Sequence, residues 1–521
     1  MPEGDLRVLD LRLVPFAVVS WSSATTAILL GSRAAWWLVA GFAGGAVAVV
    51  IVRVLRSSIR GPATGGLVAL ALFGSCCAGA VALRVQAVEE HPLTVLGRDG
   101  AWATLTVALA DDPRTLATFG NQVIVKANVV EIRTSTETVE ARGAVVVLAP
   151  ADGWLGLLPG QRAVLRGQLS SPRHRDLTLA TVRVSGPPHV VEPAPVHQDW
   201  AGALRARFAS AASALPPDQA GLLPGLVLGD TSRLSSDVKD DFTATGLTHL
   251  TAVSGANVSI ILGAVLLLVR AVGVGPRTGA VLAAIALSAF VVVARPSPSV
   301  VRAAVMGAVA LLALVAGRRK QALPALSTAV IVLLAWHPAL AVDFGFVLSA
   351  AATAGLIVIA PVWVDALVRR GWPRGVAEMF SVSAAAFAVT APVVAGMTGT
   401  VSVVSVCANI LVAPVVGVIT VLGAITAVVA AVSVQVAAVS VLLTEGPLWW
   451  LITVAERGAQ VPGASIPVPS GPTGAVLVLG VLVIGGLMVR GRRLRLVSAG
   501  IVLGLLVVWA PVWPAVLLGV V

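Results

Sequence analysis

A run of polar side chains between Asp240 and Asn257 contains the residues of this sequence best suited to chemistry. Two adjacent carboxylates come first, hydroxyl, imidazole and amide groups follow, and a long apolar stretch comes next. A polar group in hydrocarbon costs several kcal/mol unless a partner or water satisfies it. These groups therefore either pack against other helices or line a wet cavity, as in a channel or a transporter. The candidates are Asp240, Asp241, Thr245, Thr248, His249, Ser254, Gly255 and Asn257.

Two more polar groups interrupt the apolar sequence further along the chain. One is Arg295-Pro-Ser-Pro-Ser299 with Arg302, whose residues 295, 299 and 302 share one helical face. The other follows His337-Pro338 and contains Asp343, Phe346 and Ser349. Charged groups at bilayer depth cost about 2.5–3.5 kcal/mol each and usually face a pathway or a partner. The sequence predicts that all three groups lie at the extracytoplasmic side of one helical bundle.

The same residues also admit a purely structural interpretation. Arg302 then pairs with Asp343, or with Asp240 or Asp241, and the remaining groups cap helix ends. His249 fits a helix-packing role as well as a functional one. The two interpretations differ in whether the polar side chains of the three groups share one water-accessible cavity or are each satisfied within dry packing.

Motifs of known enzyme classes are absent from the sequence. The six histidines are scattered and form no His-Glu-x-x-His metal motif, and there is no nucleotide-binding Walker A loop. Three cysteines, two of them adjacent in an apolar run, make neither a disulfide framework nor a metal site. We therefore predict no catalytic residue, no metal site and no cofactor.

The composition identifies the elements that must position these groups. The chain has 521 residues, of which 57% are hydrophobic and only 12% charged, so we expect a polytopic α-helical membrane protein. Its apolar runs predict about 11 or 12 spans. Most of the excess of basic residues lies in short clusters between these runs, which indicates cytoplasmic loops rather than a nucleic-acid surface. This pattern places the N-terminus in the cytoplasm.

One segment differs from the rest in composition. Residues 89–200 hold 10 Lys and Arg against 12 Asp and Glu, and their apolar residues alternate with polar ones in five short runs. Turn signals containing proline and glycine separate these runs. A small five-stranded, OB-like barrel on the extracytoplasmic side is the simplest fold for such a pattern.

The predicted domain organisation has four parts. Residues 1–88 form N-terminal transmembrane helices, 89–199 the β-rich domain, 200–246 an amphipathic interfacial connection and 247–521 the main transmembrane domain. Within the last part, the uncharged residues 401–441 predict two short spans or a re-entrant pair, and residues 445–459 an interfacial segment. A final span is expected at about residues 496–518.

Four motifs resemble the ComEC competence family, the inner-membrane channel for DNA uptake in natural transformation. They occur in the order and at the spacing of that family, and the β-rich domain after the first spans matches its arrangement. Asn257 stands where the family often has His, and the sequence ends at Val521 without the metallo-β-lactamase-like domain of many members. The motifs are Gly246–Val258, Arg295–Ala303, His337–Leu356 and Ala391–Pro414.

The resemblance implies a bacterial plasma-membrane channel that admits single-stranded DNA and is not itself an enzyme. Its implied partners are the lipid bilayer and other competence proteins, namely an extracellular DNA receptor, a cytoplasmic ATPase and a separate nuclease. An oligomeric channel is compatible with this family-based interpretation.

Two other classes of function are compatible with the residues alone. In a small-solute or proton-coupled transporter, Asp240, Asp241, His249 and Asp343 form a proton relay. In a membrane enzyme acting on lipid-linked substrates, Asp240 and Asp241 bind a metal ion.

Overall fold

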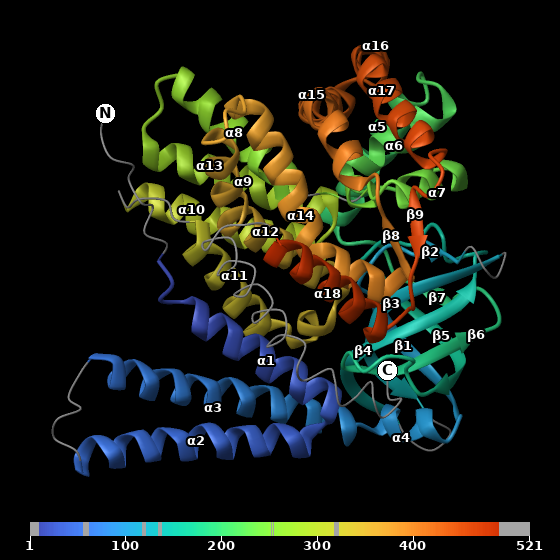
Figure 1. Ribbon diagram of the computed structural model, residues 1–521. Helices are drawn as coiled ribbons and strands as arrows, with labels where there is room; N and C mark the ends of the chain where they lie inside the picture. The colour runs from blue at the N-terminus through green and yellow to red at the C-terminus, as the bar shows by residue number, and fades with distance from the viewer. Residues whose placement is uncertain are drawn as a thin grey trace. The chain divides into compact units, whose positions relative to one another are not determined.

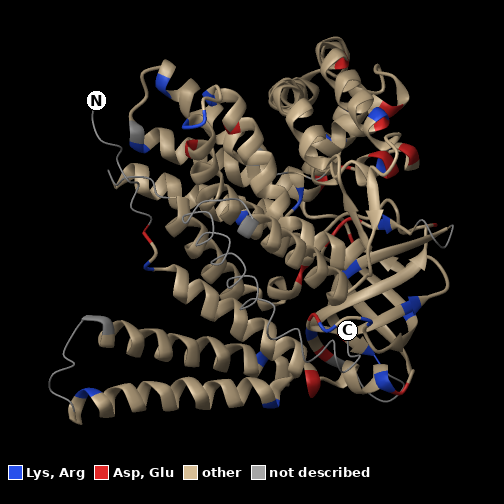
Figure 2. Ribbon diagram, viewed as in Figure 1, with Lys and Arg blue, Asp and Glu red and all other residues tan. Residues whose placement is uncertain are grey.

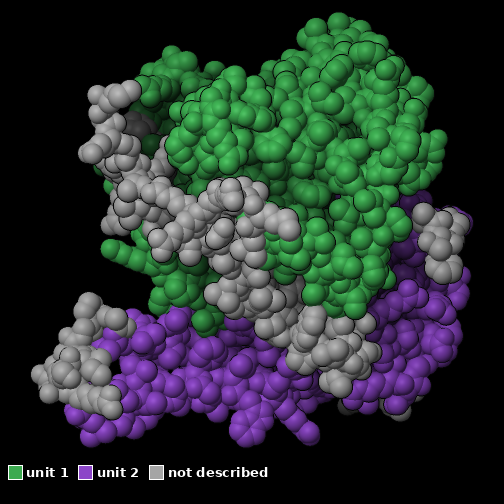
Figure 3. All heavy atoms as spheres, in the orientation of Figure 1, with its two compact units in different colours: residues 1–21, 204–336, 343–513 green, residues 22–203, 337–342, 514–521 purple. Residues whose placement is uncertain are grey.

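The computed structural model describes residues 10–55, 62–116, 121–133, 138–251, 253, 255–316 and 322–488. The described residues belong to two compact units, which are coloured separately in Figure 3. Unit 2 contains residues from 22–203 and 337–342. Unit 1 contains residues from 1–21, 204–336 and 343–513.

Unit 2 contains a long helical hairpin. Helix α2 (Ser32–Leu55) packs along α3 (Pro62–Glu89), as Figure 1 shows, and α1 (Val14–Leu30) precedes them. The backbone N–H of Ser32 donates to Glu89 Oε1 over 3.2 Å, so the last residue of α3 caps the start of α2. A carboxylate at a helix N-terminus satisfies free N–H groups and interacts favourably with the helix dipole.

The predicted OB-like barrel is present in unit 2. Five strands close in the order β1-β3-β4-β6-β5 with β5 returning to β1, and only β4 and β6 pair in parallel. Short strands β2 and β7 extend this sheet, and α4 packs on β5 and β6. The bounds are α4 (Pro92–Arg98), β1 (Trp102–Leu109), β2 (Arg114–Thr115), β3 (Gln122–Arg133), β4 (Thr138–Pro150), β5 (Arg162–Ser170), β6 (Thr178–Val184) and β7 (Val190–Val191).

Alternation of apolar and polar residues produces the barrel core. On β1 and β5 every second side chain is buried, as expected for strands with one face inside, and β3 follows the same alternation up to Val129, after which its register shifts. Leu93 of α4 is fully buried with this core. Trp154, in the connection from β4 to β5, is also fully buried, and its Nε1 donates to the carbonyl of Gly186 over 3.0 Å.

Removing the Trp154 ring is expected to destabilise the barrel. Trp154→Ala should lower the free energy of unfolding by about 3–5 kcal/mol, because it leaves a cavity and an unpaired carbonyl. Trp102→Ala is the matched control, since Trp102 is 57% exposed. Thermal unfolding of the detergent-solubilised chain, followed by trypsin cleavage at barrel arginines, measures the difference. Equal loss from both substitutions would contradict this packing.

Unit 1 consists mainly of helices, with a small two-stranded sheet. In order they are α5 (Val196–Ala212), which begins in unit 2, α6 (Pro217–Leu228), α7 (Ser236–Ala244), α8 (Gly255–Ala271), α9 (Pro276–Ala294), α10 (Pro298–Val315), α11 (Ala322–Trp336), α12 (Phe344–Val358), α13 (Ala360–Val368), α14 (Arg374–Thr398), β8 (Thr400–Ser402), α15 (Ser405–Val432), α16 (Val434–Ser440), α17 (Glu445–Ala459), β9 (Ser465–Pro467) and α18 (Pro472–Met488). Short 3-10 turns are η3 (Thr248–Leu250), η5 (Val441–Thr444) and, in unit 2, η4 (Pro338–Val342).

The helices agree in length and composition with the prediction of a membrane protein. In the described part of the chain, 8 helices are long and apolar enough to cross a bilayer, and further apolar helices are shorter. Figure 2 shows the long helices almost free of charged residues along their lengths. The predicted span at residues 496–518 lies outside the described residues.

The structure differs from the prediction between residues 401 and 459. Residues Ser405–Val432 form one continuous helix instead of two short segments, and Val434–Ala459 is a further candidate span rather than an interfacial piece. Pro414 lies inside α15 without ending it. Neighbouring helices allow such a proline in membrane proteins. Ser433, in an extended conformation, separates the two segments.

Helix α6 lies within the segment predicted to be an interfacial connection, but most of its residues are buried against other helices. Nine of its residues are buried, and it packs against α9, α15 and α17. A Cβ atom on Gly423 would overlap Val227, so α15 approaches α6 very closely at this point. A helix that is apolar all round is typically buried in this way.

Candidate functional site

The first polar group is distributed over α7, η3 and the start of α8. Asp240 is exposed on α7 and Asp241 is half-buried. Thr245 is fully buried, and its hydroxyl donates to the carbonyl of Asp241 over 2.7 Å. The Thr248 hydroxyl donates to the Phe242 carbonyl over 3.3 Å. These hydroxyls therefore close the C-terminal turn of α7.

Of the next two candidates, the structure describes His249 but not Ser254. The His249 ring is exposed, and its Nδ1 lies 3.2 Å from the carbonyl oxygen of Gly246. Ser254 lies outside the described residues. His249 thus contacts its own turn, where Gly246 has a φ of +70°.

Asn257 joins three helices in the interior of unit 1. Its side chain is 4% exposed, and Nδ2 donates to the carbonyl of Leu226 in α6 over 2.8 Å. The Thr420 hydroxyl of α15 lies 3.5 Å from its Oδ1. A buried amide with such partners links the start of α8 to α6 and α15.

The second and third polar groups meet around Arg302. Its Nε donates to the hydroxyl of Ser349 over 2.9 Å, and Ser349 Oγ lies 3.0 Å from Ser299 Oγ. The first group contributes Gly255, where a Cβ atom would lie 3.1 Å from Arg302 Nη2. We call Gly255, Ser299, Arg302 and Ser349 the Arg302 cluster. It combines residues from α8, α10 and α12.

Arg302 lacks a carboxylate partner among the residues that the structure describes. It is 4% exposed, and its Nη1 has the Met306 sulfur at 3.2 Å. No Asp or Glu oxygen in the described ranges lies within 4.0 Å of the guanidinium. Burying an unpaired charge costs several kcal/mol. The ion pairs of the structural interpretation are therefore not found there.

Asp343 and Phe346, from the third group, make contacts that stabilise the fold. Asp343 caps α12, because its Oδ1 accepts the backbone N–H of Phe346 over 2.9 Å. The Phe346 ring is fully buried, with its centroid 5.2 Å from that of Trp21. Both residues thus anchor the start of the helix that carries Ser349.

Arg295 has an unusual backbone. It is 6% exposed and follows the last residue of α9 with a φ of +68° and a ψ of 147°. A non-glycine residue in this region costs about 1–3 kcal/mol and persists only where its surroundings hold it. Such strain is typical of functional segments.

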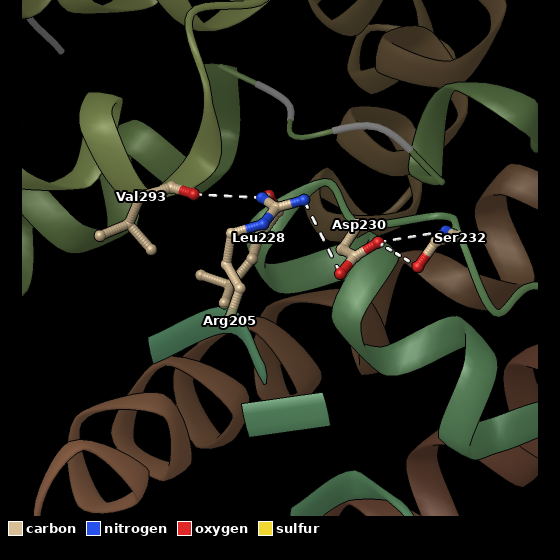
Figure 4. Close-up of polar contacts among 5 residues, drawn as sticks. All are labelled: Arg205, Leu228, Asp230, Ser232 and Val293. Atoms are coloured by element: carbon tan, nitrogen blue, oxygen red, sulfur yellow. Dashed lines mark hydrogen bonds and ion pairs between the residues drawn. The ribbon is translucent and has the colours of Figure 1, made fainter. Parts of the chain in front are cut away.

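Sequence reasoning missed an ion pair between Arg205 and Asp230. Figure 4 shows Arg205 Nη1 donating to the carbonyls of Leu228 at 2.9 Å and Val293 at 3.1 Å, while Nη2 lies 3.7 Å from Asp230 Oδ2. Asp230 is oriented by Ser232, whose hydroxyl and N–H donate to Oδ1 over 2.6 and 3.1 Å. The Asp-x-Ser turn is visible in the sequence, but no local signal points to Arg205.

The charge state of Asp230 follows from these contacts. Burial by itself raises the pKa of this carboxyl, but the Ser232 hydroxyl and the Arg205 charge more than offset it, so the pKa lies below its usual value of 3.8. The pKa of Asp241, by contrast, is raised by burial and by the negative charges of Asp237 and Asp240.

The lowered pKa predicts how stability depends on pH. Because the folded state binds this proton less readily than the unfolded state, the contribution of Asp230 is complete above pH 3.8 and is lost as the pH falls through the folded pKa. Asp230→Asn should therefore lower the free energy of unfolding by about 1–3 kcal/mol at pH 7. The difference in free energy of unfolding between Asp230→Asn and the parent chain should become smaller below pH 3.8.

Thermal unfolding of the solubilised chain between pH 7 and pH 3 checks this, with the exposed Asp237→Asn as control. A stability difference between Asp230→Asn and the parent chain that stays constant over this pH range would contradict the stabilising role of the Asp230 carboxylate.

The structure shows no metal centre among its described residues. No group of three or more His, Cys, Asp or Glu side chains there is arranged to hold a metal ion. The paired carboxylates Asp240 and Asp241 thus have no third ligand of these types within the described ranges.

The region that contains the three polar groups matches a known protein family. Residues 226–493 match the family model described as Competence protein. The chain is also 31% identical over 146 residues to ComE operon protein 3 of Bacillus subtilis (strain 168), a match that covers 28% of this chain and 19% of that protein. No solved structure matches the chain significantly. The family model covers more than half of the sequence and all three polar groups, and this chain belongs to the competence protein family.

Proposed function

We propose that this protein is a membrane channel that passes single-stranded DNA inward across the bacterial plasma membrane, without catalysis of its own. The observation that carries the proposal is Arg302, a buried cation whose described neighbours include no carboxylate. A fold that keeps such a charge gains nothing in stability from it. Membership of the competence family supports DNA as the cargo.

The Arg302 cluster has the chemistry that a moving polyanion needs. A strand in transit requires a hydrated path with some cationic charge, but tight or numerous binding sites would stop conduction. One guanidinium with two neighbouring hydroxyls, Ser299 and Ser349, offers a single weak binding contact for a phosphate. Because Gly255 has no side chain, α8 can lie close to the Arg302 guanidinium at this point.

The proposed path extends beyond this cluster. Its remaining candidates are the hydroxyl, amide, imidazole, carboxylate and guanidinium groups that precede the cluster or lie between its members along the chain, together with the Phe346 ring. These are Asp240, Asp241, Thr245, Thr248, His249, Ser254, Asn257, Arg295, Asp343 and Phe346.

The proposed topology places the N-terminus in the cytoplasm and the barrel of residues 89–199 outside it. Residues 1–88 and 247–521 then form the membrane part, joined by residues 200–246. Energy and strand processing would come from partners, namely a DNA receptor, a cytoplasmic ATPase and a separate nuclease. Self-association of the channel is compatible with this arrangement.

Uptake of end-labelled DNA in a strain lacking the gene tests the proposal. Cells that carry the parent chain should accumulate nuclease-protected label, and cells without it should not. Uptake of a labelled amino acid serves as a control for general transport. Transformation at the parental frequency in the deletion strain would eliminate the channel, whereas a selective loss of solute uptake would favour the transporter.

A further inference from the structure

We propose that Arg205 is a positioning residue of the transport path, which fixes the C-terminal ends of α6 and α9 and thereby Arg295 and Asn257. The inference rests on the proposed function, in which Arg295 and Asn257 belong to the DNA path. Arg205 lies on α5, outside the residues that the family model matches.

One guanidinium joins three separate segments. Figure 4 shows the Arg205 side chain extending from α5 to the Leu228 and Val293 carbonyls, with Asp230 on its other side. The Arg205 side chain is 11% exposed and that of Asp230 is 21% exposed. Hydrogen bonds from a charged donor are strong when water is largely excluded.

Both carbonyl acceptors are helix ends. Leu228 is the last residue of α6, and Val293 is the last but one of α9. The last four carbonyls of a helix have no intrahelical donor and carry the negative end of its dipole. Because a guanidinium presents several donors in a fixed plane, it can bind two such ends together, whereas the compact ammonium of lysine fits this geometry poorly.

The two helix ends lead directly to the polar groups. Arg295 lies two residues beyond Val293 and has the positive φ of +68°, so its backbone must be held. On α6, the Leu226 carbonyl accepts the amide of Asn257. A Cβ atom on Gly229 would lie 3.5 Å from the Ala294 carbonyl, so the turn after α6 lies against the end of α9.

Asp230 distinguishes this role from direct contact with DNA. Its carboxylate, 3.7 Å away, offsets the charge of Arg205, so a phosphate would meet no net positive charge there. Arg205 therefore acts through the placement of other residues. Loss of Arg205 should lower the maximal rate of uptake and leave the half-saturating DNA concentration unchanged.

A thiol-reactivity experiment tests the positioning without DNA. The full chain carries Cys76→Ala, Cys77→Ala and Cys407→Ala, plus one reporter, Ser297→Cys, between the prolines that follow Arg295. In detergent, Arg205→Gln and Arg205→Lys should each raise the rate at which a small methanethiosulfonate reagent modifies the reporter, by about tenfold. The control is Arg207→Gln, on the same helix. Arg207 donates a hydrogen bond to the Ala431 carbonyl, and its loss should leave the modification rate of the reporter unchanged.

A second reporter separates local displacement from unfolding. Ser381→Cys, at a fully buried position of α14 in unit 1, should stay equally unreactive in the parent and both Arg205 variants as long as unit 1 remains folded. If Arg205→Gln unfolds and exposes both reporters, the milder Arg205→Lys decides. An unchanged rate at Ser297→Cys in folded Arg205→Lys overturns the positioning role and leaves the channel proposal intact, while failed DNA uptake by the parent chain would do the reverse.

Discussion

Arg302→Met is expected to abolish most DNA uptake while leaving the chain at least as stable as its parent. Among the residues that the structure describes, the buried side chain has Ser349 and Met306 as its hydrogen-bonding partners, so an apolar side chain of similar length removes a charge without a carboxylate partner there. Replacing buried charges by apolar residues is often neutral or stabilising. Loss of a charged contact to the phosphate should lower uptake by about two orders of magnitude.

Uptake of labelled DNA per folded molecule and thermal unfolding of the purified protein measure the two effects. Arg302→Lys should retain part of the uptake, since it keeps the charge but loses the planar donor set. Arg270→Gln, at an exposed position near the end of α8, is the matched loss of one cation. A fall in stability that accounts for the fall in uptake would mean that Arg302 serves the fold.

Gly246→Ala is expected to destabilise unit 1 strongly. Gly246 has a φ of +70°, and a Cβ atom there would overlap Ser405 Oγ and lie 2.8 Å from Ser405 Cβ. Positive φ costs an alanine about 1–2 kcal/mol. Overpacking adds about 1–3 kcal/mol. The free energy of unfolding should therefore fall by about 2–5 kcal/mol, with loss of the turn that presents His249.

Gly273→Ala separates the two causes. Gly273 has a φ of +75° but nothing within 4 Å of the added Cβ, so only the conformational part applies. Denaturant unfolding of both variants gives the difference, and Ser405→Gly should recover part of the loss in Gly246→Ala but none in Gly273→Ala. Equal destabilisation by the two alanines would contradict the close approach to Ser405.

The features predictable from sequence are those that local pattern determines. Alternating apolar residues and turn signals are enough to predict the closed barrel, and the motifs around Gly246, Arg295 and Asp343 are enough to indicate the family. The spacing argument put Arg295, Ser299 and Arg302 on one helical face. It holds for Ser299 and Arg302 of α10, which both meet Ser349, and was wrong for Arg295, which lies before α10 in a non-helical conformation. Each of these inferences depends on residues that are close in sequence.

The features that escaped prediction depend on distant partners. Arg205 contacts carbonyls 23 and 88 residues away, and backbone acceptors leave no trace in residue type. Asn257 likewise bonds a carbonyl of α6, a helix that looks like part of a polar connection because Pro216-Pro217 and nearby acids surround its short apolar run. The uncharged residues 405–432 gave no sign of where, or whether, the helix would break.

The central claim is that a strand in transit passes the Arg302 cluster, and a reactive DNA tests it most directly. Single-stranded DNA with a thiol-reactive group on one backbone phosphate is offered to membranes containing the chain with its native Cys76, Cys77 and Cys407 replaced by alanine. Cysteine is placed at Ser299 or Ser349 in the cluster, or at Leu312 on α10 as control, since Leu312 is 70% exposed. The account predicts covalent DNA adducts at positions 299 and 349 and none at 312. Absence of adducts at both cluster positions, in chains that still take up unmodified DNA, would place the path elsewhere.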